Sequence, residues 1–125
     1  MRAETVPWWR QAEADLYTAE VNMAAGQFYA VSWFAQQAAE KALKALYLER
    51  NGHLPPRTHD LRFLGAELQV SSAQASDLTI LYPTFRAARY PDDSGSAPVD
   101  AIREPDATQH LGAARRTLEW IGTEL

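Results

Sequence analysis

The segment from Trp33 to Leu48, WFAQQAAEKALKALYL, constrains the fold of this chain more than any other part of the sequence. Alanines recur in it at helical spacing, at positions 35, 38, 39, 42 and 45, with large apolar side chains between them. Small residues let neighbouring helices approach closely, while the large ones fill the remaining space. Its polar residues are few: Gln36, Gln37, Glu40, Lys41 and Lys44. Such a helix is expected at the centre of a helical bundle.

The composition is typical of one acidic globular domain. The chain has 125 residues, of which 46% are hydrophobic and 22% charged, and this is enough for one core but not for two, so residues 1–125 are treated as a single domain. A net charge of -4 disfavours general binding to nucleic acid, so any such contact must come from a local patch. The absence of cysteine excludes disulfides, thiolate metal ligands and a cysteine nucleophile.

No sequence signal points to a membrane, a metal or a cofactor. The first residues contain no continuous hydrophobic stretch, so we expect neither a signal peptide nor a membrane span, and a cytoplasmic location. The three histidines lack the spacing of metal ligands, and the glycines are too scattered for a phosphate-binding loop. We therefore expect no metal and no cofactor.

Helical periodicity runs through most of the chain. We predict long helices over residues 6–24 and 28–51, joined near Gly26 by a turn so short that the two helices are antiparallel. Residues 90–104 are rich in Pro, Asp, Ser and Gly and are predicted to form a loop. Pro105 is the predicted first residue of a last helix that reaches the C-terminus.

Capping signals place two more helices between these. Thr58 is the predicted N-cap of a short helix, and Ser71 with Gln74 has the spacing of a capping box that opens another, which carries Tyr82 and Phe85. Pro83 predicts a kink or a break in that helix. The expected fold is all-α, an up-and-down four-helix bundle with one extra short helix.

Three motifs in this order resemble the HEPN domain family (higher eukaryotes and prokaryotes nucleotide-binding): FAQQAAEKALKAL, Thr58-His59-Asp60-Leu61, and Arg89-Tyr90-Pro91-Asp92. The resemblance implies a helical domain that forms a homodimer. It also implies a partner, because many members are encoded beside or fused to a minimal nucleotidyltransferase, often as a toxin-antitoxin pair. A separate subset of the family cleaves RNA without metal, using an Arg and a His four to six residues apart near the dimer groove.

The ribonuclease motif is absent where the resemblance places it. Arg86 is followed, after four residues, by Pro91 rather than by histidine. One other pair has suitable spacing, Arg103 and His110, which are two helical turns apart. Because Pro105 is predicted at the first helical position, Arg103 is expected outside the helix. Catalysis by Arg103 and His110 is therefore the alternative, and the competing interpretation is a solvated loop arginine with a surface or interhelical histidine.

Cationic and aromatic residues near the predicted break are candidates for binding a nucleotide. Arg86 and Arg89 are about one turn apart and are followed by Tyr90, so two guanidinium groups could hold a phosphate beside an aromatic ring. The competing interpretation is structural, with Asp92 and Asp93 pairing with Arg89 to anchor the loop.

Two further candidates lie elsewhere in the chain. His59 stands at a predicted helix start, where it can serve either a structural hydrogen bond or a ligand. Lys41 belongs to the polar strip of the central helix, which is either solvated or lines a groove or a dimer contact. In that strip, Glu40 and Lys44 have the spacing of a favourable ion pair.

Two functions thus remain open. The first is a non-catalytic HEPN module that homodimerises and binds a minimal nucleotidyltransferase, a nucleotide, or both. Trp8, Trp9 and Trp33 are either anchors of such a partner surface or parts of the core. The second is a metal-independent endoribonuclease that uses Arg103 and His110.

Overall fold

The computed structural model describes residues 1–125 and contains helices but no strands. The helices are α1 (Val6–Ala24), α2 (Phe28–Asn51), α3 (Leu61–Glu67), α4 (Ser72–Leu81), α5 (Thr84–Ala87), α6 (Pro98–Ala101) and α7 (Glu104–Glu124). The predicted all-α class is therefore confirmed. None of these helices combines the length and the apolar character that crossing a membrane requires.

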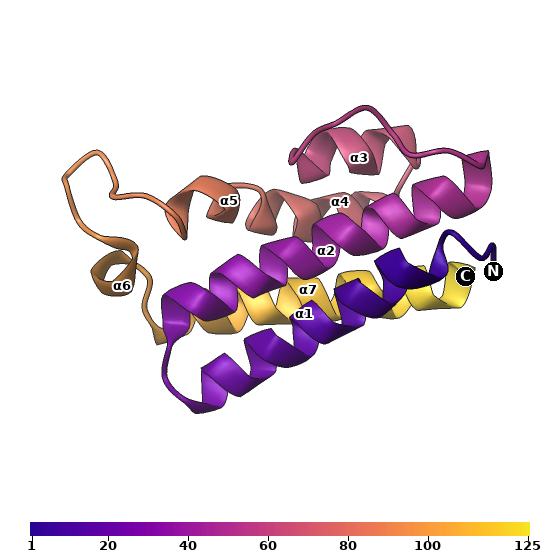
Figure 1. The fold of residues 1–125 in the computed structure, drawn as a ribbon. Coiled ribbons are helices and arrows are strands. Elements are labelled where there is room, and N and C mark those ends of the chain that lie inside the picture. Colours follow the sequence, from indigo (N-terminus) through magenta and orange to yellow (C-terminus); the bar gives the residue numbers. More distant parts are fainter.

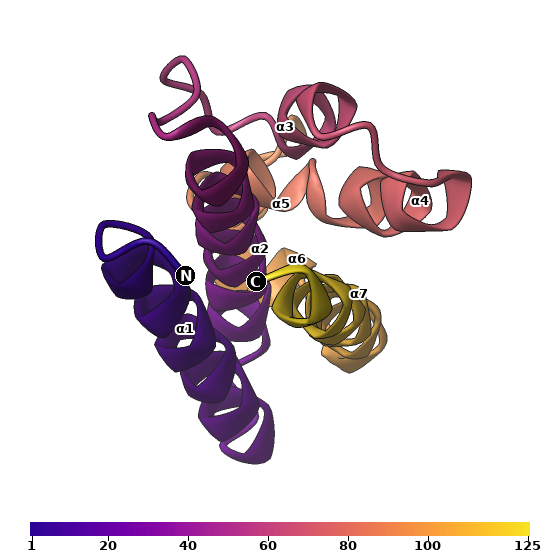
Figure 2. The ribbon, with the colours of Figure 1, turned by 90° about the vertical axis from the view of Figure 1, so that its right-hand side faces the viewer.

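Helix α2 lies at the centre of the molecule. Figure 2 shows it between α1 on one side and α7 on the other, with α3, α4 and α5 along its remaining face, and it contacts every other helix. Its alanines at positions 35, 38, 39, 42 and 45 are fully buried, as the spacing predicts. The predicted antiparallel hairpin is formed by α1 and α2, which run in opposite directions in Figure 1.

Large aliphatic side chains of α2 and of three other helices form the main core. The main core combines Leu43 and Leu46 of α2 with residues of α3, α4 and α7: Leu61, Leu64, Leu78, Leu81 and Ile121, all nearly or fully buried. Core burial of this kind supplies most of the driving force for folding.

Both ends of the chain are fastened to the last turns of α2. The backbone N–H of Arg2 donates to Glu49 Oε1 at 2.8 Å, and Arg50 Nη2 donates to Glu124 Oε2 at 3.1 Å. The N- and C-termini accordingly lie close together at one end of the molecule in both views (Figures 1 and 2).

Two of the capping predictions have different outcomes. The capping box of Ser71 and Gln74 is confirmed, with Gln74 N–H donating to Ser71 Oγ and Ser71 N–H donating to Gln74 Oε1. Thr58 as the N-cap of α3 is wrong. The cap is Asp60, whose Oδ1 accepts from the N–H groups of Arg62 and Phe63, while Thr58 Oγ1 accepts from the Asp60 N–H in the turn before the helix.

Pro83 interrupts the helix where the sequence predicts a break. Helix α4 ends at Leu81 and the short helix α5 starts at Thr84, whose hydroxyl donates to the Leu81 carbonyl at 2.7 Å. Placing Tyr82 and Phe85 on α4 itself is therefore wrong, because both lie beyond its end.

The segment after α5 is more ordered than a plain loop. It contains α6, so the structure has three short helices, α3, α5 and α6, where the sequence predicts one. Asp92 organises its first part, since its Oδ1 accepts from the N–H and hydroxyl of Ser94 and from the N–H of Ser96. Helix α7 starts at Glu104, one residue before the predicted Pro105.

Candidate functional site

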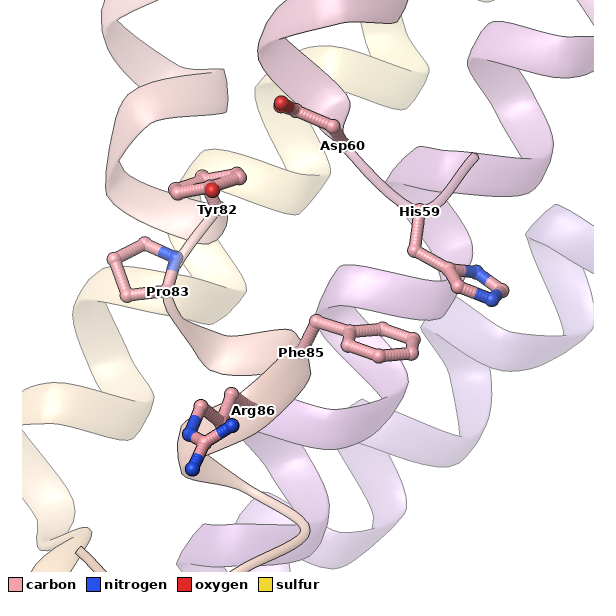
Figure 3. Close-up of a pocket in the computed structure, with 6 residues that line it drawn as sticks. All are labelled: His59, Asp60, Tyr82, Pro83, Phe85 and Arg86. Atoms are coloured by element: carbon pink, nitrogen blue, oxygen red, sulfur yellow. The ribbon is translucent and has the colours of Figure 1, made fainter. Parts of the chain in front are cut away.

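A pocket of about 390 Å³ opens between the start of α3 and the break that separates α4 from α5. We call it the α3–α5 pocket; its lining residues, labelled in Figure 3, are His59, Asp60, Tyr82, Pro83, Phe85 and Arg86. The break positions them, because Pro83 ends α4 and lets the chain turn past the N-terminus of α3. The size is within the usual range for small-molecule sites.

One wall of the pocket is held by a buried carboxylate. His59 Nδ1 lies 3.0 Å from Glu40 Oε1 on α2, and Glu40 is only 4% exposed. Glu40 also accepts from Gln36 Nε2 and from Lys44 Nζ, each at 3.1 Å. The predicted ion pair of Glu40 and Lys44 is thus confirmed, but it lies in the protein interior rather than on a solvated strip.

The same wall continues as a stack of planar groups. The His59 ring stacks on Phe85 with centroids 4.3 Å apart. The guanidinium of Arg89 lies 4.0 Å from the Phe85 centroid and 4.0 Å from the Trp33 centroid. This column of Trp33, Arg89, Phe85 and His59 ties α5 and the start of α3 to α2.

Arg89 therefore lies behind the pocket wall, while Arg86 lines the pocket. Burial lowers the pKa of the Arg89 guanidinium, and the charge of Glu40 opposes that change. Arg89 Nη1 donates to the Phe85 carbonyl at 2.8 Å. The anchoring of the loop by an Arg89 ion pair with Asp92 or Asp93 is wrong, because neither carboxylate lies within ion-pair distance of Arg89 and Asp92 is satisfied within its own turn.

The opposite side of the pocket carries an aromatic ring and a carboxylate. The guanidinium carbon of Arg62 lies 3.6 Å from the Tyr82 ring centroid, so one face of Tyr82 is covered by a cation. Asp60 uses Oδ1 to cap α3, and its Oδ2 has no hydrogen-bond partner in the protein. Figure 3 shows Asp60 and Arg86 at opposite ends of the pocket, with Tyr82, Pro83 and Phe85 between them.

The other predicted binding residues lie outside this pocket. Lys41 pairs with Asp15 of α1, a carboxylate that is 4% exposed and also accepts from Gln11 Nε2. Tyr90 is exposed and lines a second cavity of about 300 Å³ between α5 and α7, together with Asp106 and His110. The structure therefore brings Arg86 and His59 together and separates Lys41 and Tyr90 from them.

The residues of the alternative catalytic pair, Arg103 and His110, lie at the N-cap and in the second turn of α7. Arg103 is exposed and is the N-cap residue, with its N–H donating to Asp106 Oδ2 at 3.0 Å. His110 is half-buried, and its Nδ1 lies 2.6 Å from the hydroxyl of the buried Ser32 on α2. Burial lowers the pKa of His110, an effect that the charge of Asp106 opposes.

Folding stability should depend on pH through His110. Because its pKa is lowered from the ordinary 6.5, the unfolded chain binds this proton more readily than the folded one. The contribution of His110 to the free energy of unfolding is therefore fully present above about pH 6.5. It is lost as the pH is lowered toward the depressed pKa, by about 1.4 kcal/mol for each unit by which the pKa is depressed. Urea unfolding at about pH 7.5 and about pH 5 should show a larger loss for the parent than for His110→Gln; equal losses would contradict this role.

Trp8, Trp9 and Trp33, the tryptophans considered as partner anchors, are each partly buried. Trp33 stands at the end of the stacked column, Trp9 packs against the main core, and Trp8 is half-buried with Lys44 Nζ 5.9 Å from its ring. The core interpretation thus describes Trp9, while Trp33 packs against the Arg89 guanidinium.

Sequence reasoning missed four of the six pocket-lining residues as site residues: Asp60, Tyr82, Pro83 and Phe85. A signal for Tyr82 and Phe85 was present in Pro83, because residues on either side of a helix-ending proline leave the helical periodicity and need not join the core. Asp60 gave no comparable signal, since a carboxylate at a helix start has a capping role that explains it fully.

Comparison with known proteins agrees with this architecture. The sequence matches the HEPN domain family over residues 5–124. The solved structure of TT1696 from Thermus thermophilus is similar, with a TM-score of 0.90 and 25% sequence identity over 99% of this chain and 100% of that one. ST0689, described as an archaeal HEPN homologue, has a TM-score of 0.78 and 30% identity over the full length of both chains. No curated protein matches significantly. Since the family match spans all the helices described above, the chain belongs to the HEPN domain family.

Proposed function

We propose that this chain is a non-catalytic HEPN module that binds a nucleotide in the α3–α5 pocket, forms a homodimer and works with a minimal nucleotidyltransferase. The observation that carries the proposal is the pocket itself, which combines an exposed cation with aromatic side chains in a cavity of about 390 Å³. The partner protein is what membership of the family implies, and a toxin-antitoxin pair is the setting we propose for it.

Nucleotide binding requires a group for the phosphate and a surface for the base. Arg86 is exposed, forms none of the ion pairs of the protein and can donate two parallel hydrogen bonds to phosphate oxygens. Tyr82 is 36% exposed and offers an aromatic surface of the kind on which bases stack. The stacked column holds Phe85 in place as a wall of the pocket. The faces of the Phe85 ring are used in that stack and not by the ligand.

The outer face of α1 supports the homodimer. Ala14, Tyr17, Val21 and Ala24 follow one another at helical spacing and are exposed, Tyr17 by 68% and Val21 by 49%. They lie opposite the buried residues Ala12 and Ala19 of the same helix. An apolar stripe of this kind on a solvent-facing helix is typical of an interface. Light scattering should give twice the chain mass of 14.0 kDa, and a monomer at all concentrations would reject the dimer.

Reversing the charge of Arg86 is the test of nucleotide binding. We expect Arg86→Glu to weaken the binding of AMP at least about tenfold in calorimetry, because a carboxylate would then face the phosphate. Arg115→Glu, the same change at an exposed arginine of α7, is the matched control and should leave the affinity unchanged. If the parent does not bind any nucleoside monophosphate, or if Arg86→Glu binds as well as the parent, the proposed site is rejected.

Endoribonuclease activity is the second candidate, and one observation favours it. Arg103 directly precedes α7, and His110 reaches a cavity of about 300 Å³ that is open to a ligand. RNA cleavage in the presence of EDTA, lost in both Arg103→Ala and His110→Ala, would establish this activity. No cleavage by the parent chain would exclude it.

A further inference from the structure

The two ends of the α3–α5 pocket are lined by side chains of opposite charge. Such a pocket can distinguish ligands by the group at the end away from the phosphate, which a site with a cation alone cannot do. Arg86 stands at one end and Asp60 at the other, with Tyr82, Pro83 and Phe85 between (Figure 3). A nucleotide has the same polarity along its length, since the phosphate is at one end and the hydrogen-bonding edge of the base at the other. Its phosphate at Arg86 therefore directs the far edge of the base toward Asp60.

The free oxygen of Asp60 determines which base edge is accepted. Oδ1 is occupied by the N–H groups of Arg62 and Phe63, so Oδ2 is the oxygen available to a ligand. A carboxylate oxygen accepts hydrogen bonds and cannot donate them. It therefore matches an exocyclic amine and repels a carbonyl oxygen at the same position.

The rest of the pocket does not offset this preference. Arg62 has its guanidinium over the Tyr82 ring and its Nε 3.7 Å from Asp60 Oδ1, so it pairs with the oxygen that already caps α3 and leaves Oδ2 free, and the Nδ1 atom of His59 is taken by Glu40. The Phe85 ring stacks with His59 and with the Arg89 guanidinium. Phe85 has no polar group of its own, so it forms an apolar wall of the pocket. Asp60 is thus the carboxylate that lines the base end of the pocket.

Given the proposed function on which this rests, we propose that Asp60 makes the pocket selective for nucleotides whose base carries an exocyclic amine at its far edge, such as adenine, over their keto counterparts, such as hypoxanthine. The two bases have nearly the same shape, and at the exocyclic position, where Asp60 needs a donor, adenine presents an amine and hypoxanthine a carbonyl oxygen. A mismatched contact of this kind leaves the carboxylate facing a carbonyl oxygen.

The test compares AMP with IMP in calorimetry, using the parent chain and Asp60→Asn. We expect the parent to bind AMP about tenfold tighter than IMP, in line with the usual discrimination of one base-edge contact. Asparagine caps a helix as well as aspartate does, so α3 should be retained. Its amide can either accept or donate, so Asp60→Asn should bind the two nucleotides within about twofold of each other.

The possible outcomes separate this inference from the proposed function. Equal binding of AMP and IMP by the parent overturns the role of Asp60 but leaves nucleotide binding at Arg86 intact. Discrimination that persists unchanged in Asp60→Asn also overturns it, because another group would then read the base. Binding of neither nucleotide by the parent rejects the pocket as a nucleotide site and this inference with it. Circular dichroism of Asp60→Asn confirms that the helices are retained.

Discussion

Replacing Glu40 by alanine is expected to lower the free energy of unfolding by about 3 kcal/mol. The Glu40 carboxylate is 4% exposed and is shared by Gln36, Lys44 and His59, so its removal leaves several polar groups without a partner in the interior. Lys44 is the costliest of these, since its ammonium is largely buried. Urea unfolding followed by circular dichroism measures the change.

The matched control is Glu119→Ala, which removes an exposed glutamate of α7 and should change stability by less than about 0.5 kcal/mol. Glu40→Gln keeps the shape of the side chain while removing its charge, and should fall between the two. A loss below about 1 kcal/mol in Glu40→Ala would mean that water replaces the carboxylate at low cost, and the role of Glu40 in holding His59 would have to be abandoned.

Leu43→Ala should have an effect of similar size, about 3 kcal/mol, through a different mechanism. Leu43 is fully buried on α2, and the alanines of the same helix hold its neighbours at short distance. Because the helices already pack closely, they have little freedom to collapse into the space that the leucine leaves. Unfolding in urea should show a lower midpoint with the same slope.

Leu54→Ala is the control for this substitution. Leu54 follows α2 and is 45% exposed, so the same loss of side-chain atoms should cost less than about 1 kcal/mol there. If Leu43→Ala and Leu54→Ala were equally stable, the central position of α2 in the core would be contradicted.

The long helices could be predicted from the sequence because local signals and burial agree in them. The bounds of α1 and α2 match the predicted ranges, and the alanines of α2 are buried as their spacing requires. At α3 the local signals compete. Thr58 and Asp60 are both good caps, and Asp60 is used because its carboxylate reaches the first N–H groups of α3 while Thr58 closes the turn before it.

The site was harder to predict, since its residues are distant in sequence and their burial is set by tertiary packing. Arg86 and His59 meet because Pro83 redirects the chain toward the start of α3. Lys41 and Arg89 look like surface cations in the sequence, yet Asp15 pairs with the first and Trp33 stacks on the second. No periodicity distinguishes a cation that faces water from one that satisfies a buried partner.

Because Glu49 and Arg50 hold Arg2 and Glu124 at the same end of α2, the two ends of the chain are neighbours in space. A domain appended to the first residue or to the last residue would be delivered to the same pole of the molecule. Gene fusions in either order would consequently bring the added domain against the same surface, so the direction of the fusion leaves its docking geometry nearly unchanged.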